Sequence, residues 1–289
     1  MRTEHEIMEL VLTLAQKDDR VRAVGMNGSR TNPNVPKDLF RDFDIVYLVT
    51  DMDSFINDPS WVDVFGERLI MQTPENMDLF PNEMGSRFTY LIQFLDGNRI
   101  DLTLIPIEER EAYAFEDKLT VILLDKDGIM PAIPEPTDED YWVKQPSASY
   151  FADCCNEFWW VSTYVAKGLW RQEILYAYDH LSLVRAMFLK MIEWKVGIET
   201  DFSISIGKNA KYLQRYVKDD LWDVIVKTYP TCKSDAVWEA LFLMTNEFEK
   251  VALEVADQFQ FEYPFEEAKR VKNYLKHVQK LPVDAKKTY

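Results

Sequence analysis

The sequence predicts an α+β protein: an N-terminal domain with a mixed β-sheet flanked by helices, followed by an all-α helical bundle. Short strand-like apolar runs fill the first half of the chain, whereas long stretches with helical spacing fill the second. Between them, residues 130–146 contain several prolines among acidic residues, which is typical of a linker. We therefore expect two domains, at residues 1–135 and 136–289, each within the roughly 100–200 residues typical of a domain.

The first half alternates helices and strands. Apolar residues recur every three or four positions in residues 4–17, which predicts a helix. Residues 99–105 alternate between apolar and polar side chains, which predicts a strand that Pro106 ends. Residues 88–94 are ambiguous between strand and helix. The other expected strands are residues 21–26, 43–50, 68–72 and 121–124, and short helices are expected at residues 61–66 and 108–115.

The second half is read as a series of helices, the first two of which are long and rich in aromatic side chains. Tryptophan and tyrosine at helical spacing are more often part of a core than of a ligand site. The expected helices are residues 148–167, 172–196, 209–217, 221–228, 234–258 and 265–280.

The composition narrows the classes of function. The chain is 47% hydrophobic and 13% aromatic, which supports large cores and argues against disorder. Its formal net charge of −16 disfavours a protein that binds DNA or RNA through a basic surface, so we expect no nucleic-acid partner. The same charge is compatible with a cationic substrate, whose local concentration it would raise.

The cysteines and the apolar segments indicate the compartment. Three cysteines are present, and the neighbours Cys154 and Cys155 are poor partners for a disulfide, so we expect reduced thiols in the cytoplasm. The sequence shows no basic region followed by a short apolar stretch at its start. It also has no run of about 18 apolar residues, so no membrane association is expected.

Two aspartates one residue apart are the strongest chemical signal in the chain. Asp42 and Asp44 lie at the start of an apolar run, and residues i and i+2 of a strand point to the same face. Two neighbouring carboxylates beside a buried strand repel each other unless a cation lies between them. Such a pair alone is usually a surface feature, but its apolar flank favours a site for Mg²⁺, which prefers hard oxygen ligands shared with substrate phosphates.

Two further features extend the pair to a phosphate-handling site. Asp101 lies on the polar side of the alternating strand and would supply a third carboxylate, although it could instead pair with Arg99 on a solvated edge. Gly28 and Ser29 form a turn after the first strand, where glycine lets the backbone approach a phosphate closely. Three carboxylates of this kind could hold one or two Mg²⁺ ions against a nucleoside triphosphate.

The Gly-Ser turn, the Asp-x-Asp strand and the later lone aspartate together resemble the DNA polymerase β-like nucleotidyltransferase superfamily. More narrowly, the whole chain resembles the bacterial aminoglycoside 6-adenylyltransferases, which modify streptomycin. The segments that carry this narrower resemblance are residues 25–30, 40–45, 93–104, 190–194 and 207–213.

The resemblance implies the transfer of AMP from ATP to a hydroxyl of streptomycin, at the 6-position, with release of pyrophosphate and resistance to the drug. Asp42, Asp44 and Asp101 would be the catalytic residues and the ligands of Mg²⁺, with Asp101 alternatively accepting the hydroxyl proton. Gly28, Ser29 and Arg30 would contact the triphosphate. The resemblance therefore assigns the nucleotidyltransferase activity to the first domain.

The helical domain would then bind the substrate. By the same resemblance, Lys208 would reach the triphosphate from a helix start, and Asp179 would contact the drug. Either residue could instead be an ordinary solvated side chain on a helix. We expect the enzyme to act as a monomer.

Two other functions stay open at this point. The chain could transfer a nucleotide to another acceptor, such as a protein; an RNA end is disfavoured by the acidic charge. It could also be an inactive nucleotide-binding relative. Such a relative would be expected to have lost a metal carboxylate, and all three are present in this sequence.

Overall fold

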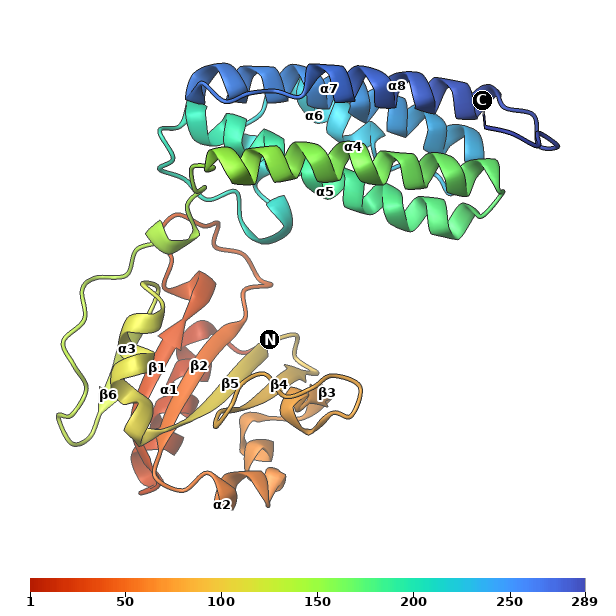
Figure 1. Cartoon of the computed structure of the whole chain (residues 1–289). Coiled ribbons are helices and arrows are strands. Elements are labelled where there is room, and N and C mark those ends of the chain that lie inside the picture. The colour runs from red at the N-terminus through yellow and green to blue at the C-terminus, as the bar shows by residue number, and fades with distance from the viewer. Residues whose placement is uncertain (289) are drawn as a thin grey trace. The chain divides into compact units, whose positions relative to one another are not determined.

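The computed structural model describes residues 1–288 and divides the chain into two compact units, Met1–Asp140 and a second that begins at Tyr141. The first unit contains a six-stranded sheet with helices, and the second is helical (Figure 1). The predicted α+β class is therefore confirmed. The division falls inside the proline-rich segment, while the functional roles predicted for residues 1–135 and 136–289 stay predictions.

The first unit is built on one mixed sheet. Its strands are arranged in the order β3-β4-β5-β2-β1-β6; β2 and β5 are parallel and the other neighbours are antiparallel. The ambiguous residues 88–94 form a strand. The elements are α1 (Glu4–Lys17), β1 (Val21–Asn27), η1 (Gly28–Arg30), β2 (Phe43–Val49), α2 (Asp53–Ile56), η2 (Pro59–Phe65), β3 (Arg68–Gln72), η3 (Pro74–Asn76), β4 (Phe88–Phe94), β5 (Arg99–Pro106), η4 (Ile107–Glu109), α3 (Arg110–Glu116), β6 (Val121–Asp125) and η5 (Glu139–Tyr141).

Helix α1 shows why these residues form this element. Thr3 caps its start, with the Thr3 side chain accepting from the Glu6 amide and the Glu6 side chain accepting from the Thr3 amide. Ile7, Val11 and Ala15 share one face at helical spacing and are fully buried against the sheet. The predicted bounds of this helix are those observed.

The two faces of the sheet differ in their cover. Phe43, Ile45 and Tyr47 of β2 point into the core beneath α1, whereas Val46 and Leu48 point to the opposite face and pack with Tyr113 of α3. Because side chains alternate along a strand, the even-numbered residues of β2 share the α3 face. This alternation decides on which face the aspartates lie.

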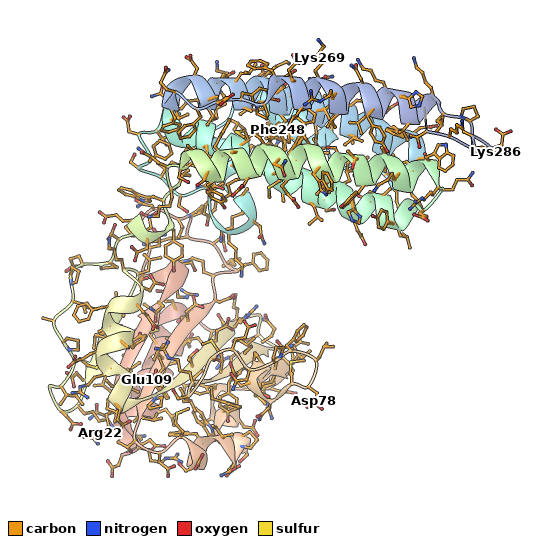
Figure 2. The ribbon with its side chains drawn as sticks, viewed as in Figure 1. Arg22, Asp78, Glu109, Phe248, Lys269 and Lys286 are labelled. Carbon is orange, nitrogen blue, oxygen red and sulfur yellow. The ribbon has the colours of Figure 1, made fainter. Side chains whose placement is uncertain are left out.

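The second unit is a bundle of long helices around an aromatic core. The rings of Phe158 and Phe248 stack with their centroids 3.7 Å apart, and Phe248 lies among the helices in Figure 2. Ser147 caps the first helix by accepting from the Tyr150 amide. The α-helices are α4 (Ala148–Trp170), α5 (Ile174–Glu199), α6 (Asp219–Lys227), α7 (Ser234–Phe259) and α8 (Phe265–Lys280). Within residues 1–288, none of the helices combines the length and apolar character needed to cross a bilayer.

One predicted helix, at residues 209–217, is wrong. The segment forms only two short 3-10 turns, Lys208–Ala210 and Leu213–Arg215. Asn209 and Ala210 have φ angles of 55° and 58°, in the left-handed region that a continuous right-handed helix excludes. The apolar spacing in this segment reflects the burial of Leu213 against the bundle rather than a helix.

Candidate active site

Asp44 and Asp101 are brought side by side by the parallel pairing of β2 and β5. The two residues are direct partners in the register of these strands, which places neighbouring backbones about 4.8 Å apart. Their apolar neighbours Ile45 and Leu102 are fully buried in the core beneath α1. By alternation, both carboxylates therefore lie on the opposite face of the sheet.

Asp42 lies just before β2 and is fixed by Arg30. The Arg30 Nε donates to the Asp42 carbonyl at 2.9 Å, and its Nη2 donates to the Arg41 carbonyl at 2.8 Å. The guanidinium also stacks on the ring of Phe43, 3.5 Å from its centroid, and pairs with Glu4 at 2.7 Å. The Arg30 side chain is 8% exposed. Three donor atoms of Arg30 thus hold Glu4 and the main chain beside Asp42, and its contact with a triphosphate stays a prediction.

The Gly28–Ser29 turn follows β1 and packs directly against Asp44. Gly28 has a φ of +73°, and a Cβ atom there would lie 2.2 Å from Asp44 Oδ2. Only glycine allows both the backbone conformation and this approach. The turn thus brings the backbone of Gly28 to the edge of the carboxylate pair.

Asn27 anchors this turn from the other side. Its side chain accepts from the Tyr113 hydroxyl at 2.8 Å and donates to Thr120 at 2.7 Å. Sequence patterns do not reveal this anchor, because Tyr113 and Thr120 are distant along the chain and carry no motif. Tyr113 lies on α3 and Thr120 directly before β6, so their role follows only from the packing of these two elements against β1.

Electrostatics at the site are dominated by the carboxylates. Burial, followed by the negative charges of Asp101 and Asp42, raises the pKa of Asp44 to about 6. Arg99 acts in the opposite direction, since its guanidinium lies close to the cluster. It donates to both oxygens of Asp101, at 2.7 and 2.8 Å, and its Nε lies 3.6 Å from Asp42 Oδ2. The alternative pairing of Asp101 with Arg99 is thus observed, but on the interior strand β5 rather than on a solvated edge.

The residues fit a magnesium ion by donor type. Asp42, Asp44 and Asp101 offer hard carboxylate oxygens on adjacent backbone segments. Burial of Asp44, and after it the neighbouring negative charges, raises the pKa of Asp44. Across residues 1–288, however, no three histidine, cysteine or carboxylate side chains are already gathered into a metal-binding group. The three side chains would have to converge further for all of them to ligate one ion.

The two predicted residues of the helical unit are separated in the chain by most of α5 and by the segment that follows it. Asp179 is exposed near the start of this helix, roughly 30 Å along the axis from Glu199 at its end. Lys208 is exposed in the segment after that end, where Val143 donates its backbone amide to Ile204. Lys208 follows Gly207, which has a φ of +72°, and it begins a short 3-10 turn rather than the predicted α-helix.

Comparison with known protein families identifies the family of this chain. A family model described as streptomycin adenylyltransferase matches residues 1–278. The chain belongs to the streptomycin adenylyltransferase family. The resemblance predicted from the sequence is therefore confirmed.

Relatives of this streptomycin adenylyltransferase family member cover nearly its whole length. An aminoglycoside 6-adenylyltransferase of Campylobacter jejuni is 47% identical over 95% of this chain and 95% of its own. Enzymes of the same name from Bacillus subtilis (strain 168) and Staphylococcus aureus are 46% and 38% identical over 91% and 96% of this chain, and 94% and 99% of their own. A crystal structure of an aminoglycoside 6-adenyltransferase from Bacillus subtilis has 39% sequence identity, covers 97% of this chain and 100% of its own, and gives a TM-score of 0.49. The family assignment rests on the sequence matches.

Proposed function

We propose that this protein transfers AMP from ATP to a hydroxyl of streptomycin, at the 6-position, releasing pyrophosphate and conferring resistance to the drug. The observation that carries the proposal is the pairing of Asp44 with Asp101 across β2 and β5, with the Gly28 backbone packed against Asp44. Membership of the streptomycin adenylyltransferase family and three similar aminoglycoside 6-adenylyltransferases support the choice of acceptor.

In this proposal Asp42, Asp44 and Asp101 hold Mg²⁺ together with the triphosphate. Bound there, Mg²⁺ would neutralise phosphate charge and favour deprotonation of the attacking hydroxyl. The backbone of Gly28 lies against Asp44, which supports a role for Gly28 and its neighbour Ser29 in binding phosphate oxygens.

The transfer itself is a displacement at the α-phosphorus of ATP. The drug hydroxyl oxygen forms a bond to that phosphorus, the bond to the pyrophosphate oxygen breaks, and the hydroxyl proton passes to a carboxylate. Asp101 is the proposed acceptor of the proton if it is not fully used as a metal ligand. Arg30 holds the backbone of Asp42 and thereby orients its carboxylate.

The acidic charge of the chain favours a cationic acceptor. A net charge of −16 raises the local concentration of a substrate with two guanidinium groups and repels nucleic acid. Lys208 is proposed to reach the triphosphate, and Asp179 to contact the drug. The monomeric state and the cytoplasmic location stay predictions from the sequence.

The proposal is tested with purified protein, ATP, Mg²⁺ and streptomycin, by measuring pyrophosphate release. We expect release that depends on the drug and that is abolished by Asp42→Asn and Asp44→Asn, while both variants retain their circular dichroism spectra. Release no faster than in the drug-free control would reject streptomycin as the acceptor. Near wild-type turnover in either variant would reject the assignment of the metal ligands.

A further inference from the structure

Arg99 occupies both carboxylate oxygens of Asp101. The two residues lie two positions apart on β5, so their side chains share one face of the sheet. The Arg99 Nε and Nη2 donate to Asp101 Oδ1 and Oδ2 at 2.7 and 2.8 Å. This two-pronged geometry is the strongest form of an arginine–carboxylate pair.

The same guanidinium also approaches Asp42. Its Nε lies 3.6 Å from Asp42 Oδ2, so one arginine spans two of the three carboxylates. Asp44 is the direct partner of Asp101 across the strands and adds a third negative charge. Arg99 is thus the cation that limits the mutual repulsion of the cluster when no metal is bound.

This arrangement competes with metal binding at Asp101. A divalent cation needs at least one oxygen of that carboxylate. Arg99 bonds to both oxygens, and its positive charge repels a second cation beside them. The Arg99 side chain is 39% exposed, whereas that of Asp101 is 19% exposed, so the guanidinium can move toward solvent more easily than the carboxylate. Once released, it would stay at the rim of the cluster, where an anionic phosphate is its natural partner.

We propose that Arg99 is a displaceable counter-cation of the carboxylate cluster, which exchanges Asp101 for the triphosphate when Mg²⁺ binds. It lowers the affinity of the nucleotide-free protein for divalent cations, and it makes metal and ATP bind cooperatively, because the phosphates receive the guanidinium that the metal displaces. This inference deepens the proposed function and rests on its metal site.

The test measures Mn²⁺ binding to the nucleotide-free protein by electron paramagnetic resonance, without streptomycin. We expect Arg99→Gln to bind Mn²⁺ more tightly than the wild type, by roughly 5-fold or more. A non-hydrolysable ATP analogue should raise the Mn²⁺ affinity of Arg99→Gln by a smaller factor than that of the wild type, because only the ligation of the metal by the phosphates then contributes. Arg99→Lys keeps the charge without the two-pronged geometry, so its Mn²⁺ affinity should lie between those of the wild type and Arg99→Gln.

Arg22→Gln is the matched control. Arg22 makes a similar two-pronged pair with Asp127, at the end of β1 opposite to Asn27, and Figure 2 labels it in the first unit. The Arg22→Gln variant should bind Mn²⁺ with the same affinity as the wild type. Unchanged or weaker Mn²⁺ binding in both Arg99 variants would overturn the inference.

Asp44→Asn separates this inference from the proposed function. If the wild type and Asp44→Asn bind Mn²⁺ equally, the metal site itself is wrong. If Asp44→Asn loses the Mn²⁺ signal while both Arg99 variants match the wild type, the metal site stands and only the role of Arg99 is rejected.

Discussion

Gly28 and Asp44 are in such close contact that a Cβ atom at residue 28 would lie 2.2 Å from Asp44 Oδ2. The contact joins the turn after β1 to the first carboxylate of β2. It fixes the distance between the proposed phosphate-binding backbone and the proposed metal ligand. Substitution of Gly28 therefore tests whether this distance matters for the reaction.

Gly28→Ala should lower the adenylyl-transfer rate by about 100-fold, since a displacement of about 1 Å at a reacting group has an effect of this size. The φ of +73° should also cost about 1 kcal/mol of stability. Steady-state kinetics and urea unfolding measure the two effects.

Gly128→Ala is the control. Gly128 has a φ of +65°, but a Cβ atom there would meet no other atom within 4 Å. The Gly128→Ala variant should therefore lose stability but keep its activity. Equal losses of activity in both variants would contradict the role given to the contact.

The stability of the metal-free protein should depend on the protonation of Asp44. Its folded-state pKa of about 6 lies above the unfolded value, so the folded protein binds more protons between these values. The contribution of Asp44 to the free energy of unfolding is therefore present at low pH and is lost as the pH rises through about 6. The free energy of unfolding should fall by about 2 kcal/mol over this range, a value that allows for screening of the charges by solvent.

Urea unfolding in EDTA at several pH values tests this dependence. The stability of Asp44→Asn relative to the wild type should rise by about 2 kcal/mol between about pH 4 and pH 8. Asp96→Asn is the control. Hydrogen bonds from Arg2 lower the pKa of Asp96, so the stability that Asp96 contributes is nearly constant above about pH 4 and is lost only in stronger acid. A difference between Asp44→Asn and the wild type that does not change with pH would contradict the assigned environment of Asp44.

Arg30 should act on the catalytic rate rather than on ATP binding. Arg30→Gln removes the hydrogen bonds that hold the Asp42 and Arg41 carbonyls, so kcat should fall by at least about tenfold while the KM for ATP changes little. Glu4→Gln is the control: Glu4 pairs with Arg30 but its side chain is 57% exposed, so a small effect is expected. A raised KM for ATP with unchanged kcat would instead support direct contact with the triphosphate, as the sequence predicted.

Lys208 and Asp179 should affect different substrates. Lys208→Gln should raise the KM for ATP, whereas Asp179→Asn should raise the KM for streptomycin, each by about tenfold for the loss of one charged contact. The proposed roles assign the two residues to different substrates, so neither variant should change the other constant. Unchanged KM for streptomycin in Asp179→Asn would remove Asp179 from the substrate site.

The sequence predicted the elements of this fold better than it predicted the partners of single side chains. Local patterns are sufficient for the helix Glu4–Lys17 and for the strand Arg68–Gln72. The helix predicted at residues 209–217 was wrong because left-handed residues interrupt an apolar spacing that looks helical. Spacing records which side chains are buried but not the backbone path between them.

The candidate site was predictable in its residue types but not in its contacts. Asp42 and Asp44 stood out because they are one residue apart beside an apolar run. The pairing of Asp44 with Asp101 depends on the parallel register of two strands that are distant in the chain. The attachment of Arg30 to the main chain beside Asp42 depends on the path of the loop between them, for which the sequence carries no periodic signal.

The proposed reaction is tested most directly by the mass spectrum of streptomycin after incubation with the protein, ATP and Mg²⁺. We expect a drug whose mass has increased by one adenylyl group, with the new phosphodiester at the 6-hydroxyl in its NMR spectrum. We also expect no modified drug with Asp44→Asn. Unmodified streptomycin after complete incubation with the folded wild-type protein, or adenylylated streptomycin in the Asp44→Asn reaction, would contradict the proposed reaction and its metal site.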